Sequence, residues 1–158
     1  MGVYRHLVEN PASLSLFRGM YNIPANVEVR PDTSDDGFVT DDGWMPFWRV
    51  TIVEAGVRFP LHSLLRNCLE QWNLSPCQLL PNGYKIIMGA VRLNEILGIN
   101  LSVPDIEETY DLCKSAEGNT HYLRLRARRA GFVTALEDSH KYAGDDRVFV
   151  KGGWEFGK

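Results

Sequence analysis

The fold is decided by the stretch from Gly56 to Gly98, which reads GVRFPLHSLLRNCLEQWNLSPCQLLPNGYKIIMGAVRLNEILG. This stretch combines helix start and stop residues with amphipathic spacing. Pro60 suits the first position of a helix. Apolar side chains then recur at the spacing that places them on one helix face, namely Leu61, Leu64, Leu65, Cys68, Leu69 and Trp72. The sequence therefore predicts a helix that starts at Pro60 and packs along one side.

A second long helix is predicted in the same stretch, after a short turn. Ser75 and Pro76 form a cap followed by a proline, and Pro81 must stop or redirect the turn that they open. Asn82 is the predicted cap of the long helix, and Gly98 is its predicted end. Two apolar faces cover most of its circumference: Tyr84, Ile87, Met88 and Val91 on one, and Ile86, Ala90, Leu93 and Leu97 on the other. We expect this helix to be the central helix of the core.

Further helices are predicted on either side of this stretch. Asn10 can cap a short helix in which Pro11 occupies the first turn. Another helix is expected over about residues 104–115, with Cys113 on its apolar stripe. The segment from Phe47 to Glu54 is open between two structures, a strand, which its β-branched residues favour, and a helix.

The residues after Gly118 change to an alternation of period two, which predicts a half-exposed strand. The two sides of this strand are His121, Leu123, Leu125 and Ala127, and Tyr122, Arg124, Arg126 and Arg128. Two short β-prone runs follow, at Phe132–Val133 and at residues 148–150. The predicted fold class is α+β, with a mainly helical core and a small C-terminal antiparallel β-sheet.

The composition is that of an ordinary globular protein. The 158 residues include 44% hydrophobic and 23% charged residues, with a formal net charge of -3. We expect a single globular domain over residues 1–158, with a core from about 14 to 156 and an acidic loop at 30–43. No apolar run approaches the roughly 20 residues of a membrane span. The absence of a secretory pattern and the odd number of cysteines indicate an intracellular location, in the cytoplasm or nucleus.

Six segments, taken in order, carry a likeness to a known family. They are FRGMYNIP (17–24), GVRFPL (56–61), LSPCQLLPN (74–82), the helix end at 89–97, YLRLRAR (122–128) and VFVKGGWEF (148–156). With these segments the chain resembles the plant domain family named after putative gypsy-type transposons, or transposases, which occurs in retroelement-derived proteins. The resemblance implies an origin near the gag-like part of a retroelement coding region. It implies no established activity, since "transposase" in the family label is a name by association.

No catalytic or metal-binding motif stands out in the chain. A transposase needs three carboxylates that converge on two metal ions, whereas the paired aspartates from Asp35 to Asp42 lie in a loop that contains Gly and Ser. Zinc needs four ligands in short paired spacings, but Cys68, Cys77, Cys113 and His121 are scattered. His62 is expected to be a surface or capping residue rather than a general base. We therefore expect no enzymatic activity, no metal and no cofactor.

One basic cluster has a possible binding role. It consists of Tyr122, Arg124, Arg126, Arg128 and Arg129. The guanidinium groups could follow phosphates while the tyrosine stacks on a base. The alternative is that arginines on an exposed edge strand prevent edge-to-edge aggregation and pair with nearby acidic residues. The overall acidity of the chain also argues against strong non-specific binding of nucleic acid.

Three hypotheses of function follow. The first is a retrotransposon-derived, non-enzymatic domain with a structural or protein-interaction role, whose partner is an unidentified protein. The second is a nucleic-acid-binding module that uses Tyr122 and the arginines from Arg124 to Arg129. The third is a DNA-processing transposase, which the missing carboxylate geometry disfavours.

Overall fold

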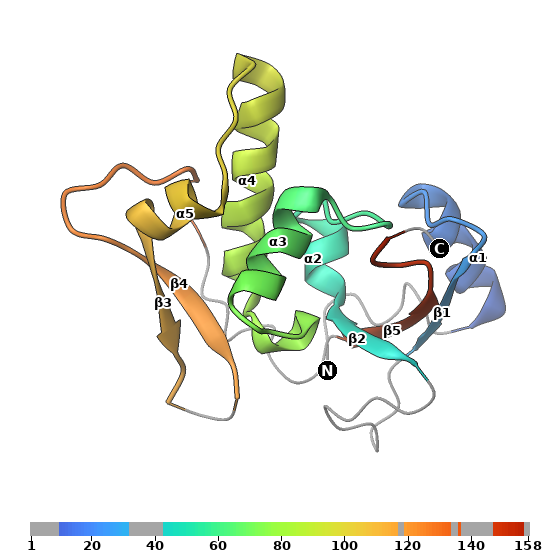
Figure 1. Ribbon diagram of the computed structural model, residues 1–158. Coiled ribbons are helices and arrows are strands. Elements are labelled where there is room, and N and C mark those ends of the chain that lie inside the picture. Colours follow the sequence, from blue (N-terminus) through green and yellow to red (C-terminus); the bar gives the residue numbers. More distant parts are fainter. Residues whose placement is uncertain (1–9, 32–42, 117–118, 134–135, 137–146, 157–158) are drawn as a thin grey trace.

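The computed structural model describes residues 10–31, 43–116, 119–133, 136 and 147–156. Its helices are α1 (Pro11–Met20), α2 (Arg49–Val53), α3 (Ser63–Gln71), the 3₁₀ turn η2 (Pro76–Gln78), α4 (Pro81–Leu97) and α5 (Val103–Thr109). Its strands are β1 (Val27–Pro31), β2 (Met45–Trp48), β3 (Tyr110–Lys114), β4 (His121–Leu125) and β5 (Arg147–Gly152). This mixture of helices and antiparallel strands confirms the predicted α+β class (Figure 1).

The strands form two sheets. One has three strands in the order β1-β5-β2, and the other consists of β3 and β4. In the three-stranded sheet, Val150 lies opposite both Val29 and Met45, so β5 is the central strand. The predicted sheet was confined to the C-terminal part, and this was wrong, because β5 pairs with two strands from the first third of the chain. Local alternation does not record which distant strand will be the partner.

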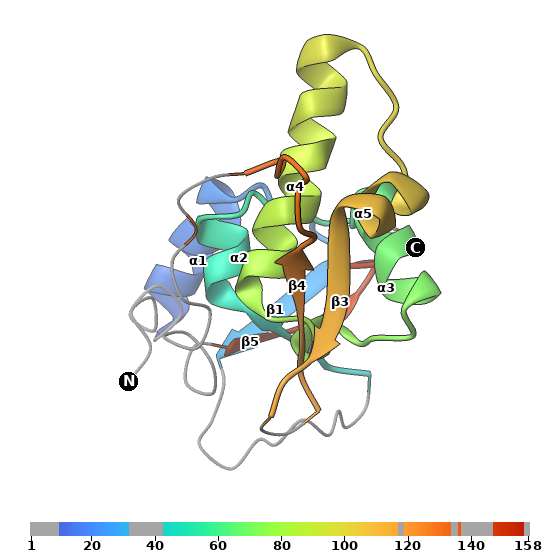
Figure 2. The same ribbon diagram turned by 90° about the vertical axis from the view of Figure 1, so that its left-hand side faces the viewer.

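The helix α4 lies between the two sheets (Figures 1 and 2) and contributes several side chains to the core. Buried side chains of α4, including Tyr84 and Ile87, belong to the same cluster as Phe47 of β2 and Val148 of β5. The helix also contacts α2, α3 and β4. Burial of apolar side chains from elements so distant in the sequence is the main contribution that stabilises the fold.

Only the N-terminal part of α4 is in the core. Ile87 and Ala90 are fully buried, whereas Ile96 and Leu97 are 61% and 60% exposed. Figure 2 shows the C-terminal end of α4 projecting beyond the other elements. The prediction that Leu97 fills a core face was therefore wrong, because periodicity identifies an apolar face but not where other elements stop covering it.

Two helix boundaries follow the sequence prediction closely. Asn10 caps α1: its Oδ1 accepts a hydrogen bond from Ser13 N at 2.9 Å, and Ser13 Oγ accepts one from Asn10 N at 3.0 Å. Pro11 occupies the first turn. At the end of α4, Gly98 has a φ of 63°, the left-handed conformation that glycine adopts readily.

The starts of the two long helices differ from the prediction. Pro60 does not begin α3, because the Phe59–Pro60 bond is cis and the helix begins at Ser63. His62 is its cap, and its Nδ1 accepts a hydrogen bond from Leu64 N at 3.1 Å, which confirms the predicted capping role. Pro81 begins α4, so Asn82 is its second residue rather than its cap.

Three other segments differ in part from the secondary structure that the sequence predicts. The segment from Phe47 to Glu54 contains both structures that were considered, since β2 ends at Trp48 and α2 follows at once. The helix predicted over 104–115 ends at Thr109, and Cys113 lies in β3, where pairing with β4 replaces the helical hydrogen bonds. Phe132 and Val133 are not in a strand.

Part of the predicted acidic loop lies outside the described residues. Arg30 and Pro31 belong to β1, which is a strand rather than a loop, and Gly43 precedes β2. The five aspartates of the predicted loop fall between them, among the residues that are not described. None of the described helices combines the length and the apolar character that crossing a membrane requires.

Candidate functional site

The predicted arginine strand is shorter than expected. β4 ends at Leu125, so of the four arginines only Arg124 is in the strand. Arg126 N donates to Thr109 O at 2.9 Å, and Arg129 N donates to Arg126 O at 3.3 Å. Arg128 has a φ of 65° in this turn. The period-two pattern predicted a strand through Arg128, and this was wrong because the chain turns away from β3 after Arg126.

Asp111 of β3 neutralises part of the basic cluster. Its Oδ1 lies 2.9 Å from Arg126 Nη1, and its Oδ2 lies 3.6 Å from Arg124 Nη2. Arg126 Nε also donates to Glu107 O at 2.9 Å. Because Asp111 faces Arg124 across the strand pair, the ladder itself brings these charges together. This is the pairing with a nearby acidic residue that the structural alternative predicted.

The other members of the cluster lie in different surroundings. Arg128 and Arg129 are exposed, and neither forms an ion pair with a described residue. Arg129 borders a shallow depression of about 410 Å³ whose other lining residues are Pro104, Glu107, Glu108 and Arg126. Tyr122 is half-buried and packs against the core. Acidic and basic side chains therefore lie close together here, since Glu107 and Glu108 border the same depression as Arg126 and Arg129.

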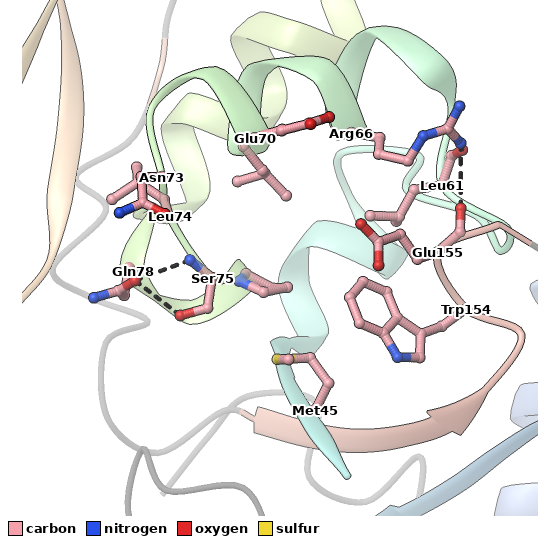
Figure 3. Close-up of a pocket in the computed structure, with 12 residues that line it drawn as sticks. Met45, Leu61, Arg66, Glu70, Asn73, Leu74, Ser75, Gln78, Trp154 and Glu155 are labelled. Atoms are coloured by element: carbon pink, nitrogen blue, oxygen red, sulfur yellow. Dashed lines mark hydrogen bonds between the residues drawn. The ribbon is translucent and has the colours of Figure 1, made fainter. Parts of the chain in front are cut away.

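A larger pocket lies elsewhere, between α3, β2, η2 and the segment that follows β5 (Figure 3). Its volume is about 460 Å³. The described residues that line it are Met45, Leu61, Arg66, Leu69, Glu70, Asn73, Leu74, Ser75, Pro76, Gln78, Trp154 and Glu155. Sequence analysis did not identify this pocket, because its walls come from three separate segments of the chain.

Arg66 of α3 attaches the C-terminal segment to this pocket. Its Nη1 donates to Leu61 O and to Glu155 O, both at 3.3 Å. Its guanidinium carbon lies 4.5 Å from the centre of the Phe156 ring. Leu61 N also donates to Trp154 O at 2.9 Å. These contacts hold residues 154–156 against the start of α3.

The apolar wall of the pocket is formed by Trp154 and Met45, which are both half-buried (Figure 3). The Trp154 ring packs edge-on against Phe47, with ring centres 5.5 Å apart. Met45 is held opposite Val150 by the pairing of β2 with β5. One side chain of this wall is therefore fixed by core packing and the other by strand register.

The opposite wall is formed by η2 and is also well fixed. Gln78 Oε1 accepts hydrogen bonds from Ser75 N at 2.9 Å and from Ser75 Oγ at 2.8 Å. The Tyr84 hydroxyl donates to Pro76 O from inside the core. Burial raises the pKa of Tyr84 well above its ordinary value, so this hydroxyl stays protonated and can donate.

Two carboxylates border the pocket without a cationic partner among the residues that the structure describes. Glu70 lies on α3, and Glu155 follows Trp154 in the segment after β5, with its carboxylate drawn above the Trp154 ring (Figure 3). Neither forms an ion pair with a residue that the structure describes. Three segments of the family resemblance contribute lining residues, namely 56–61, 74–82 and 148–156, but nothing in the sequence indicates that they meet.

The described cysteines and histidines do not gather into a site. Among the described residues, no group of three or more His, Cys, Asp or Glu side chains is arranged to hold a metal ion. Cys68 and Cys77 are buried, and Cys113 is half-buried on β3. Burial, with a smaller effect of the Glu107 charge, raises the pKa of Cys68 to about 12, so this thiol stays protonated at neutral pH.

Two candidate regions are therefore present, the arginine cluster at the end of β4 and the pocket beside Trp154. The depression at the arginine cluster and the pocket share none of their described lining residues. Comparison with known proteins finds no family model that matches the sequence, and no curated protein or solved structure that is significantly similar to the chain.

Proposed function

We propose that this chain is a retrotransposon-derived, non-enzymatic domain that acts inside the cell by binding another protein. The observation that carries the proposal is the pocket beside Trp154, with an apolar wall and a polar rim. Protein interfaces commonly anchor on such pockets, which receive a single large side chain of the partner. The ordered segments that resemble the gypsy-type transposon family support a gag-like origin.

The rigidity of the pocket supports a binding role. A preformed pocket loses little conformational entropy when a partner binds, which improves affinity. Strand pairing, ring packing and the capping box of η2 hold Met45, Trp154 and Ser75 in place. We also propose that the core is mainly helical, with α4 as the scaffold on which α3 and η2 are arranged around the pocket.

The titratable groups with altered pKa values support a non-enzymatic role. Active sites tend to gather such groups in a cleft. Here Cys68 and Tyr84 are shifted because they are buried in the core. The pKa of Asp105 is lowered because it accepts hydrogen bonds from Ser102 N and Oγ in the capping box of α5. Each shift has a structural cause, and none of these residues lines the pocket beside Trp154.

Selection from a random peptide library displayed on phage tests this proposal. We expect the purified chain to enrich a convergent peptide motif, and Met45→Trp, which places a larger ring in the pocket wall, to weaken the selected peptides at least about tenfold. The control is Leu125→Trp, which adds the same ring at a residue that is 44% exposed and does not line the pocket. Thermal unfolding verifies that both variants fold.

Two results would count against the proposal. Peptides that bind Met45→Trp as well as the unmodified chain would remove the pocket from the interaction, and failure to enrich any motif would remove the interaction itself. A metal-dependent DNA cleavage activity that is lost in Asp35→Asn or Asp41→Asn would contradict the non-enzymatic role and favour a DNA-processing transposase.

A second candidate function is nucleic-acid binding through the cluster from Tyr122 to Arg129. The observation that favours it is the exposure of Arg128 and Arg129, which have no ion pair among the described residues. Fluorescence anisotropy at about 50 mM salt should then detect binding that weakens in Arg128→Gln/Arg129→Gln and falls as salt is raised. Arg92→Gln is the control, because Arg92 is also exposed but pairs with Glu95. Undetectable binding at this salt would exclude the candidate.

A further inference from the structure

We infer that the pocket beside Trp154 takes an arginine or lysine side chain of the partner protein, held between the Trp154 ring and the carboxylates of Glu70 and Glu155. The inference rests on the proposed function and adds to it the chemistry of the residue that is bound. It predicts that the partner presents an exposed basic residue to this face of the molecule.

The charges of the pocket favour a cation. Among the described lining residues, the charged groups are two carboxylates and one guanidinium, so this part of the lining is acidic on balance. The guanidinium of Arg66 already bonds to two carbonyl oxygens and stacks on Phe156. The carboxylates of Glu70 and Glu155 have no such partner in the described part of the chain. A hydrogen bond between an ammonium or guanidinium group and a carboxylate is stronger than one between neutral groups.

The apolar wall favours a cation on a long hydrocarbon stem. A cation that lies within about 6 Å of an aromatic ring centre is attracted to the ring face, and tryptophan gives the strongest attraction. The Met45 thioether offers a polarisable contact for the methylene groups, which lysine and arginine bury while their charged ends stay near polar groups. A short polar side chain would leave this wall uncovered.

The chain itself already packs guanidinium groups in this way. Besides the contact between Arg66 and Phe156, Arg30 lies 4.3 Å from the centre of the Phe149 ring. The indole ring of Trp154 lies in the pocket wall (Figure 3). Among the described residues it contacts the Phe47 ring, and no basic side chain stacks on it. The pocket therefore offers a partner the kind of contact that the fold uses internally. An acidic side chain would instead meet two carboxylates.

Nuclear magnetic resonance of the four tryptophan indole N–H groups tests the inference directly. Single Trp→Phe variants assign the signals of Trp44, Trp48, Trp72 and Trp154. The probes are N-acetyl-arginine amide and N-acetyl-citrulline amide, which have nearly the same shape but differ in charge. We expect the arginine probe to shift the Trp154 signal in a saturable way, and the citrulline probe to bind at least about fivefold more weakly.

Isosteric substitutions then test the carboxylates. Glu70→Gln/Glu155→Gln should weaken the arginine probe at least about fivefold, and raised salt should weaken it in the unmodified chain. Glu28→Gln is the matched control, because Glu28 is an exposed carboxylate on β1 that does not line the pocket. Glutamine keeps the shape of the side chain, and the two pocket carboxylates make no described ion pair whose loss would unfold the chain.

The outcomes separate this inference from the proposed function. Equal binding of both probes, or unchanged arginine binding in the double variant, overturns the preference for a basic side chain. The proposed function would still stand if Met45→Trp weakens binding of the selected peptides. Those peptides would then share no required Arg or Lys. If no peptide depends on Met45, the proposed function fails, whatever the probes show.

Discussion

At the residue scale, two buried hydrogen-bond donors hold the η2 region to the core. The Tyr84 hydroxyl donates to Pro76 O, and Trp48 Nε1 donates to Leu79 O at 2.9 Å. Both rings are at most 1% exposed, so water does not replace either partner when one is lost. A buried carbonyl that loses its donor carries the full cost of its desolvation. These donors therefore also hold the wall of the candidate pocket.

Removal of the Tyr84 hydroxyl should destabilise the protein without leaving a large cavity. We expect Tyr84→Phe to lower the free energy of unfolding by about 1–3 kcal/mol, because Pro76 O loses its buried donor. The control is Tyr122→Phe, since Tyr122 is half-buried and its hydroxyl has no hydrogen bond to a described residue; we expect a change within about 0.5 kcal/mol. Urea unfolding measures both, and equal effects would argue against the buried hydrogen bond.

The Cys68 thiol should make the protein less stable in alkaline solution. Its pKa rises from an ordinary value of 9.0 to about 12 in the folded state, so the unfolded chain releases this proton first. The contribution is fully present below pH 9 and is lost as the pH rises toward 12, at up to about 1.4 kcal/mol per pH unit. Cys68→Ala should flatten the decline of unfolding free energy between about pH 8.5 and 10.5. Urea unfolding in reductant measures the slopes, and parallel slopes for the chain and Cys68→Ala would refute this assignment.

At the element scale, α4 has two parts with different roles. Its first part lies between the two sheets (Figure 1). The side chains of Tyr84, Ile86 and Ile87 are buried there. Its last turn presents Ile96 and Leu97 to the exterior, although both side chains are apolar. Tertiary neighbours rather than composition therefore decide how much each turn of this helix contributes to stability.

Substitutions along α4 should reveal this difference. Ile87→Ala should lower the free energy of unfolding by about 2–5 kcal/mol, because it removes buried methyl groups and leaves a cavity. Leu97→Ala should change it by no more than about 0.5 kcal/mol, because the leucine is largely exposed and alanine is the better helix former. Thermal unfolding compares the two, and a large cost for Leu97→Ala would mean that another surface covers this turn.

At the scale of the whole molecule, β5 joins the C-terminal part of the chain to strands from its first third. It pairs with β1 on one side and β2 on the other, and the segment after it supplies Trp154 to the pocket. Gly152 makes this arrangement possible, because its φ is 101° and its α-carbon faces the backbone of Asn26 closely. Gly153 N donates to Asn26 O at 3.0 Å just beyond it. The end of β5 is therefore a site where a side chain does not fit.

An alanine at this position should disrupt both the sheet and the pocket. We expect Gly152→Ala to lower the free energy of unfolding by at least about 2 kcal/mol, because a Cβ atom would collide with Asn26 O and the φ is unfavourable for alanine. Gly19→Ala is the control, since nothing lies near its Cβ position in α1 and alanine favours the helix by about 0.5–1 kcal/mol. Thermal unfolding measures both changes, and a Gly152→Ala protein as stable as the unmodified chain would show that the turn relaxes easily.

Local chemistry explains which features could be predicted before the structure. Some helix ends could be predicted because they depend on hydrogen bonds or dihedral angles within a few residues. Examples are the caps Asn10 and His62 and the end of α4 at Gly98. The β-prone run in β5 likewise became a strand. The boundary at Thr109 was missed because β3 gains its hydrogen bonds from β4, which is more distant than any helical partner.

The candidate sites divide in the same way. Sequence alone identified the arginines from Arg124 to Arg129, since they are adjacent in the chain, but not Asp111, which pairing brings to two of them. It did not identify the pocket beside Trp154 at all, because Met45 and Glu70 join that residue only after β2, α3 and the end of β5 have packed. By itself the sequence determined the mixed α+β class and several helix ends. Only the tertiary structure decided strand partners, the exposed end of α4 and the pocket, because those depend on contacts between distant residues whose energies local patterns do not contain.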